Sequence, residues 1–164
     1  MDCDRNHLED AAEHLRQATS LFQARGTRDG EGAALARLGD ILRCRHPLAD
    51  ATDVLQRALA IYVSLSDRDG QGLVLFTLGE TYRDSGDAAS SVRCLQEALV
   101  NYRAIGDRSG EAQTPHAYGG LLAERGEKTL ALDAWRKALT IFDELGDPRA
   151  QVIRRLAAGG AGGA

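Results

Sequence analysis

A sequence period of 40 residues constrains this chain more than any other feature. The similar segments "GTRDGEG", "SDRDGQG", "GDRSGEA" and "GDPRAQV" begin at residues 26, 66, 106 and 146, with no insertion between them. Other columns keep the same register: glycine at 39, 79 and 119, alanine at 18, 58, 98 and 138, and an aromatic residue at 22, 62, 102 and 142. A fixed period of this length is typical of a repeat protein, in which each unit packs on its neighbours.

Each period contains two stretches with the spacing of an amphipathic helix. Apolar residues recur three and four positions apart, as in Leu35, Leu38 and Leu42 and then in Leu55, Leu59 and Tyr62. This spacing predicts an all-α array of helical hairpins, and no alternating pattern predicts a strand. Gly106 and Gly146 follow second helices, where left-handed C-caps are expected. Pro47 and Pro148 stand where a first helical turn accepts proline, and Asp147 is a natural N-cap.

Small residues recur where the two helices of a pair should meet. The glycine column at 39, 79 and 119 lies on the first helices, and the alanine column at 58, 98 and 138 lies on the second. Small side chains let helix axes approach closely, and we expect Leu55, Leu95 and Trp135 to fill the space beside them.

The segment Leu78-Gly79-Glu80-Thr81-Tyr82, followed by Ser91, Leu95 and Ala98, resembles the tetratricopeptide repeat. The unit of that family, about 34 residues long, is lengthened here by a longer second helix and a "G-D-R-x-G" turn. The resemblance covers about residues 8–157 and implies a right-handed superhelical solenoid of antiparallel helix pairs. The departures are Pro115 in the leucine column and Leu42 and Leu122 in the tyrosine column.

The register divides residues 1–157 into a single array. We expect a half repeat over 6–25, repeats over 28–66, 68–106 and 108–146, a capping helix over 148–157, and a disordered Gly/Ala tail over 158–164. The N-terminal helix lacks a preceding partner, which suggests either truncation from a larger protein or self-association.

Pro115 stands inside the predicted first helix of the third repeat. Proline removes one backbone hydrogen bond and crowds the carbonyl four residues earlier. Either the helix kinks there, or it begins late with Thr114 as N-cap; a kink is favoured because Gly106-Asp107 already supplies a start signal. A regular helix from Asp107 to Glu124 would contradict both. The expected distortion moves His116, and with Gly120 it widens the concave face.

Composition favours a cytoplasmic protein without a membrane or direct nucleic-acid partner. The net charge is −4, the basic residues form no run longer than a pair, and no apolar run is long enough to span a bilayer. Three cysteines suggest no disulfide framework and fit a reducing compartment.

No catalytic, cofactor or metal motif is present, so we expect neither an enzyme nor a cofactor. His7 and His14 are interpreted as surface residues, Cys44-Arg45-His46 as a helix end, and Cys94 as a packing residue. The periodic Arg28, Arg68 and Arg108 alternate with aspartates, which favours turn and cap chemistry over an anion-binding stripe.

Function is expected on the concave face, which the resemblance places on the first helices. Register positions there form the candidate peptide-binding groove: Asp40, Arg43, Leu73, Phe76, Glu80, Arg83, Gln113, His116 and Glu124. An aromatic anchor in a mixed-charge wall suits a protein or peptide ligand. The opposing interpretation is that Phe76 packs on a neighbouring repeat and the charges merely solvate the surface. Ala36 and Asp40 replace the Lys and Asn of the chaperone-tail clamps of this family, so a co-chaperone role is disfavoured.

The sequence therefore predicts a non-catalytic binding scaffold. We expect a regulatory interaction module, because its "G-D-R-x-G-E-A" turns resemble those of arrays attached to larger bacterial transcriptional or signalling regulators. The alternative is a self-assembling structural module that forms homo-oligomers through the N-terminal helix. A third hypothesis is an accessory part of an enzyme that holds a small ligand in the groove.

Overall fold

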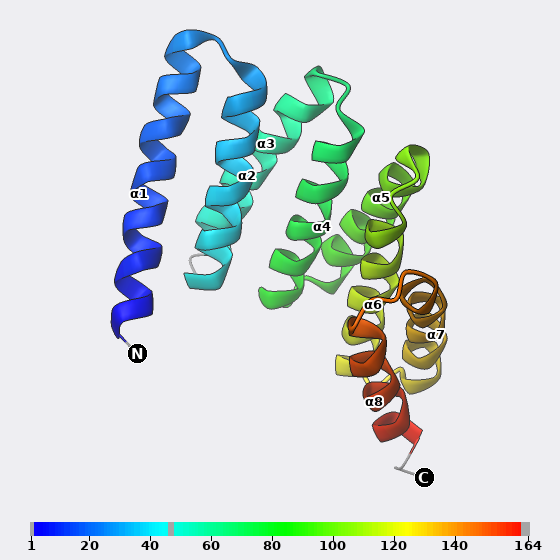
Figure 1. Ribbon diagram of the computed structural model, residues 1–164. Coiled ribbons are helices and arrows are strands. Elements are labelled where there is room, and N and C mark those ends of the chain that lie inside the picture. The colour runs from blue at the N-terminus through cyan, green and yellow to red at the C-terminus, as the bar shows by residue number, and fades with distance from the viewer. Residues whose placement is uncertain (1, 46–47, 162–164) are drawn as a thin grey trace.

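The computed structural model describes residues 2–45 and 48–161, and these residues form helices and the short turns between them (Figure 1). The helices are α1 (Asp2–Arg25), α2 (Arg28–Arg45), α3 (Leu48–Ser64), α4 (Arg68–Asp84), α5 (Ala88–Ile105), α6 (Arg108–Glu124), α7 (Lys128–Glu144) and α8 (Arg149–Ala161). Each helix packs on the one that follows it, and α2, α4 and α6 also contact one another in turn. The predicted solenoid of helix pairs is confirmed, with first helices in one layer and second helices α3, α5 and α7 in the other.

Aspartates begin several of the helices and left-handed glycines follow several of them, as the periodic turns predict. Asp67 and Asp107 are the N-caps of α4 and α6, and Asp147 accepts a hydrogen bond from the Arg149 backbone N–H at 2.8 Å. Gly106 and Gly146 are left-handed, with φ of 71° and 64°. Pro47 lies outside the described residues. The cap interactions therefore set the helix bounds, because they satisfy backbone groups that the helix leaves unpaired.

The glycine column lets the helices of each pair approach closely. A Cβ atom added to Gly39 would lie 2.4 Å from the Leu55 side chain, and one added to Gly79 would lie 2.8 Å from Leu95. The expected packing of large residues over these glycines is confirmed.

A second small–large pairing links each second helix to the next first helix. A Cβ atom on Gly30, Gly70 or Gly110 would strike the ring of Phe22, Tyr62 or Tyr102. At the fourth position of the column, Phe142 is fully buried and Ala150 takes the place of the glycine. Both pairings repeat every 40 residues, so the sequence period is a packing period.

Helix α6 corrects the expectation for Pro115. The helix runs from Arg108 to Glu124 with Pro115 inside it and Asp107 as its N-cap, so the late start is wrong. The helix continues without a break on both sides of the proline. The Asp107 cap and the packing of Ala112, Gly119 and Leu122 hold the helix through the missing hydrogen bond.

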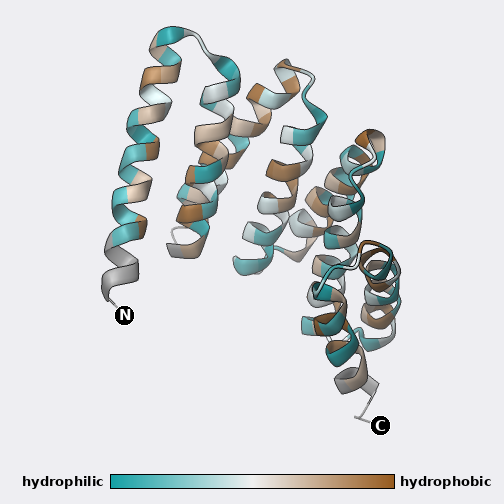
Figure 2. Cartoon of the chain, viewed as in Figure 1, coloured by the Kyte–Doolittle hydropathy of each residue, from teal (hydrophilic) through white to brown (hydrophobic). Residues whose placement is uncertain are grey.

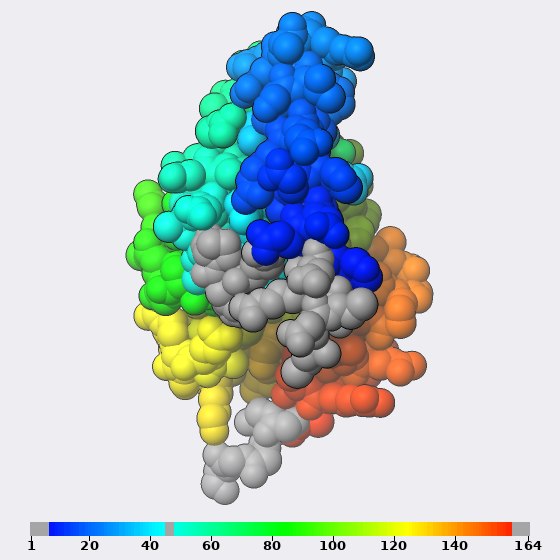
Figure 3. All heavy atoms as spheres, turned by 90° about the vertical axis from the view of Figure 1, so that its left-hand side faces the viewer, coloured from blue at the N-terminus to red at the C-terminus, as the bar shows by residue number. Residues whose placement is uncertain are grey.

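The two ends of the array are formed by α1 and α8, for which the sequence predicts a half repeat and a capping helix. At the N-terminal end, α1 packs along α2 and keeps Leu21 63% exposed; Figure 2 shows mainly hydrophilic positions on this helix. Figure 3 shows α1 lying across this end of the molecule. At the other end, α8 continues to Ala161 and so includes the first four positions of the Gly/Ala tail expected from residue 158. Alanines at 157, 158 and 161 favour helix, and each added residue gains a hydrogen bond. Residues 162–164 lie outside the described part.

No described helix is long and apolar enough to cross a membrane.

Candidate functional site

Five of the nine predicted groove residues come together with Asp84 in one set of ion pairs at the C-terminal ends of α2, α4 and α6. We name this set the first-helix ion cluster; its members are Asp40, Arg43, Glu80, Arg83, Asp84 and Glu124. Helical spacing places i and i+3 members on one face of each helix, and the contact of neighbouring first helices brings the three faces together.

The pairs cross from helix to helix. Arg43 of α2 donates to Asp84 of α4 at 3.0 Å, and Arg83 of α4 lies 3.8 Å from Glu124 of α6. Within α4, the Arg83 guanidinium lies 2.9 Å from Glu80. Two guanidinium groups therefore serve four carboxylates, which leaves a surplus of negative charge. The side chains of Asp40 and Glu124 are each 61% exposed and carry that surplus to solvent.

Burial shapes the inner part of the cluster. Burial raises the pKa of Glu80 above its ordinary value, although Arg83 and Arg43 act in the opposite direction. Burial also opposes the charge of Arg43, but its hydrogen bond to Asp84 and the nearby Asp40 outweigh this effect and raise its pKa. The buried Arg43 Nε makes no hydrogen bond within the described residues, and Glu80 Oε1 lies 2.9 Å from the Arg83 guanidinium without hydrogen-bond geometry. The centre of the cluster is thus desolvated and incompletely paired.

Gly120 leaves room for the bridge to α6. A Cβ atom at this position would lie 3.7 Å from Arg83 Nη1, with no other heavy atom outside its own stretch of helix closer than 4 Å. The position therefore has room for a methyl group at ordinary van der Waals distance from the guanidinium that reaches toward Glu124.

The remaining predicted groove residues do not join the cluster. Leu73 is 52% exposed on α4, whereas Phe76 is half-buried against the apolar group of Leu75, Ala98 and Tyr102. The structure therefore places Phe76 in inter-helix packing and leaves Leu73 as the more accessible apolar side chain.

His116 and Gln113 are also engaged within the solenoid. The half-buried ring of His116 meets Phe142 edge-on at 6.4 Å, and the guanidinium of Arg149 stacks 4.4 Å above the same phenyl ring. Burial, followed by Arg149 and Arg83, lowers the pKa of His116. Gln113 donates to the Ser109 hydroxyl at 3.2 Å.

The side chains set aside as non-functional lie mostly where expected. His7, His14 and Cys44 are exposed and Cys94 is half-buried, while His46 lies outside the described residues. Arg28 pairs with Glu31, and Arg108 with Glu111 and Glu144. Among the residues that the structure describes, no His, Cys, Asp or Glu side chains form a group of three suited to a metal ion.

Sequence reasoning missed a cavity of about 760 Å³ on the other side of the molecule, between α5 and α7 over α6. Pro115 lines this cavity, so its effect falls on the second-helix side and not on the concave face. The available signal was the joint replacement of a leucine and a tyrosine by Pro115 and Leu122 in the 40-residue register.

Comparison with known proteins gives a family and a fold. Residues 30–104 match the family model described as the tetratricopeptide repeat. A solved structure, described as the crystal structure of MamA protein, matches with a TM-score of 0.58 at 18% sequence identity. That match covers 94% of this chain and 84% of the other. No curated protein sequence matches the chain.

Proposed function

Since the chain belongs to the tetratricopeptide-repeat family, we propose that it is a non-catalytic scaffold whose first-helix layer binds a basic peptide segment of a partner protein. Repeats of this family generally mediate protein–protein interactions. The proposal extends this general role to a regulatory interaction module, with the bound segment lying along α2, α4 and α6.

The observation that carries the proposal is the surplus of carboxylates in the first-helix ion cluster. Asp40 lies 3.6 Å from Arg43 and Glu124 lies 3.8 Å from Arg83, so neither exposed carboxylate makes a close pair. A lysine or arginine of an incoming peptide can pair with them with little desolvation, which favours association and specificity more than raw affinity. The exposed Leu73 offers an apolar contact on the middle helix of the layer.

Peptide arrays test the proposal. We expect the purified chain to bind arrayed peptides of positive net charge and to lose about tenfold in affinity when Asp40→Asn and Glu124→Gln are combined, because both exposed carboxylates are then neutral. Asp53→Asn combined with Glu97→Gln removes the same charge from exposed positions on α3 and α5 and serves as the matched control.

Added salt should weaken the interaction further, since exposed charges are screened. Equal loss in the control pair, or binding that ignores peptide charge, would contradict the proposal.

A further inference from the structure

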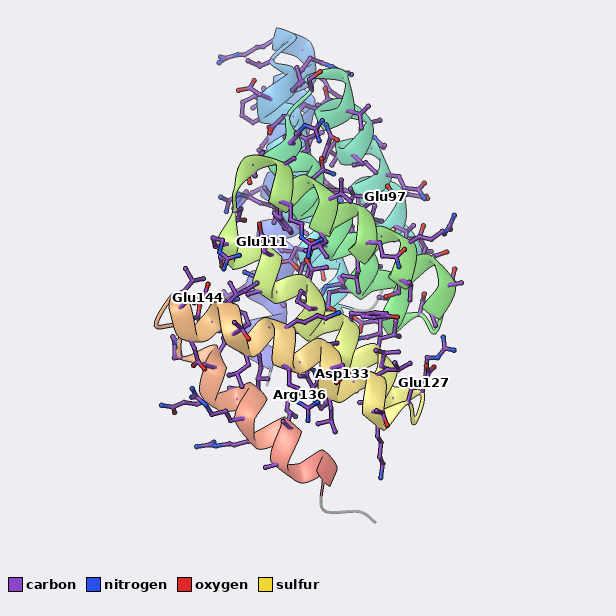
Figure 4. The ribbon with its side chains drawn as sticks, turned by 90° about the vertical axis from the view of Figure 1, so that its right-hand side faces the viewer. Glu97, Glu111, Glu127, Asp133, Arg136 and Glu144 are labelled. Carbon is purple, nitrogen blue, oxygen red and sulfur yellow. The ribbon has the colours of Figure 1, made fainter. Side chains whose placement is uncertain are left out.

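The α5–α7 trough is an elongated cavity of about 760 Å³ on the second-helix side. We define it by the apolar residues Leu95, Leu99, Pro115, Tyr118, Leu122 and Ile141. Its lining extends along α6 from Arg108 to Leu122, about 21 Å at a rise of 1.5 Å per residue. In Figure 4, α6 lies between α5 and α7, with Glu111 and Glu144 toward the same end.

The trough arises from substitutions within the repeat register. In the preceding repeat, Leu75 is buried, and the hydroxyl of Tyr82 accepts a hydrogen bond from Gln56 of α3 at 3.2 Å. Pro115 and Leu122 replace these two residues, so neither the leucine side chain nor the tyrosine bridge is present. The same location is thus bridged at one repeat junction and hollow at the next.

The charges around the trough are unevenly paired. Arg108 pairs with both Glu111 and Glu144, and Asp133 pairs with Arg136 at 3.0 Å, so each carboxylate of the lining has a partner. Arg103 on the α5 wall and Lys137 on the α7 wall make no ion pair within the described residues. The trough therefore combines an apolar floor with an unneutralised cation on each wall.

From this juxtaposition we propose that the α5–α7 trough binds an amphipathic helix of a partner protein, apolar on one face and acidic along both edges of that face. An α-helix is about 10–12 Å across, so its apolar face enters the trough while its polar face stays in solvent. Acidic residues on the two edges would then face Arg103 and Lys137 on the opposite walls. A single-headed amphiphile such as a fatty acid has one anionic group for two separated cations, which favours the helix. This site is independent of the first-helix ion cluster, from which it differs in location and in the sign of its free charges.

Fluorescence anisotropy with designed peptides tests the proposal on the full chain. The probe is a labelled helical peptide about as long as the trough, with leucines at i, i+3 and i+4 spacing and glutamates on both edges. A matched peptide carries lysines in place of the glutamates. We expect the acidic-edged peptide to bind at least about tenfold more tightly than the lysine-edged peptide.

Variants locate the binding. Arg103→Glu combined with Lys137→Glu should reverse the order of the two peptides, whereas Arg57→Glu, an exposed arginine on α3, should preserve it. Leu130→Gln should weaken both peptides without unfolding the chain, because Leu130 lines the cavity but is 53% exposed. Circular dichroism checks that each variant folds.

Three results would overturn the proposal. The first is equal binding of the two peptides by the unmodified chain, and the second is an unchanged order in the doubly reversed variant. The third is saturable binding of a long-chain fatty acid together with no binding of the acidic-edged peptide, which would assign the trough to a small amphiphile.

Discussion

At the residue scale, two adjacent glycines in α6 have opposite roles. Gly119 lies in the packing column, where an added Cβ would fall 2.4 Å from the Trp135 ring. The indole Nε1 donates to the His116 carbonyl at 3.2 Å and so holds that ring in place. Gly120 has ordinary van der Waals room for a methyl group. The two glycines are adjacent in the same helix, so they differ only in the side chains that surround them.

Alanine substitution should therefore separate the two positions. We expect Gly119→Ala to lower the free energy of unfolding by about 1–3 kcal/mol, because the methyl group overpacks the contact with Trp135. Gly120→Ala should raise it by about 0.5–1 kcal/mol, since alanine loses less backbone entropy in a helix. Urea denaturation of both variants measures the effect. A similar change of either sign at the two positions would contradict the packing explanation.

At the scale of elements, the junction of α6, α7 and α8 contains a half-buried titratable group, His116. His116 and Arg149 both contact the ring of Phe142, and the lowered pKa of His116 means that the folded state binds a proton less readily than the unfolded chain. The stabilisation from the neutral ring is fully present above the unfolded pKa of about 6.5 and is lost as pH falls through the lower folded pKa.

We expect the melting temperature to fall as pH is lowered from 7, and His116→Gln to reduce this slope. His14→Gln removes an exposed histidine of α1 and is the matched control. Glu80, whose pKa is raised, has a dependence of opposite sign, with stability lost as pH rises above about 4.5. The difference between the unmodified chain and His116→Gln isolates the histidine. An identical slope in both would contradict the assignment.

At the scale of the whole molecule, the apolar core is divided along the solenoid. One cluster joins Ala112, Leu122, Trp135, Phe142 and Ile153 of α6, α7 and α8, while others are built around α1–α5. In a linear array each repeat depends mainly on its immediate neighbours, so damage at one end reaches the other only weakly.

Leu55→Ala should reveal this division. Leu55 is fully buried in the N-terminal half, and its truncation should cost about 2–5 kcal/mol locally. We expect the denaturation midpoint from circular dichroism to fall more than the midpoint from fluorescence of Trp135, the single tryptophan, because that side chain lies in the C-terminal cluster. Phe142→Leu should instead lower the fluorescence midpoint more than the circular dichroism midpoint, because Phe142 lies in the same cluster as Trp135. Coincident transitions in both variants would indicate one cooperative unit.

The sequence by itself determined the array, the helix pairs, their caps and the glycine contacts. These features repeat every 40 residues and depend on short-range geometry, such as Gly39 beneath Leu55 or Asp107 before α6. Such local features can be recognised in a single sequence because every repeat has the same residue types at the same positions.

Only the tertiary structure decided what happens between repeats. The sequence placed Asp40, Arg43, Glu80, Arg83 and Glu124 on one face, but the distances from helix to helix determined which of them pair. It placed Phe76 in the groove, whereas packing against α5 half-buries it. It assigned the effect of Pro115 to the concave face, whereas that residue lines the trough between α5 and α7. The physical reason is that side-chain burial and ion pairing depend on how neighbouring helices are spaced, which a helical period alone does not specify.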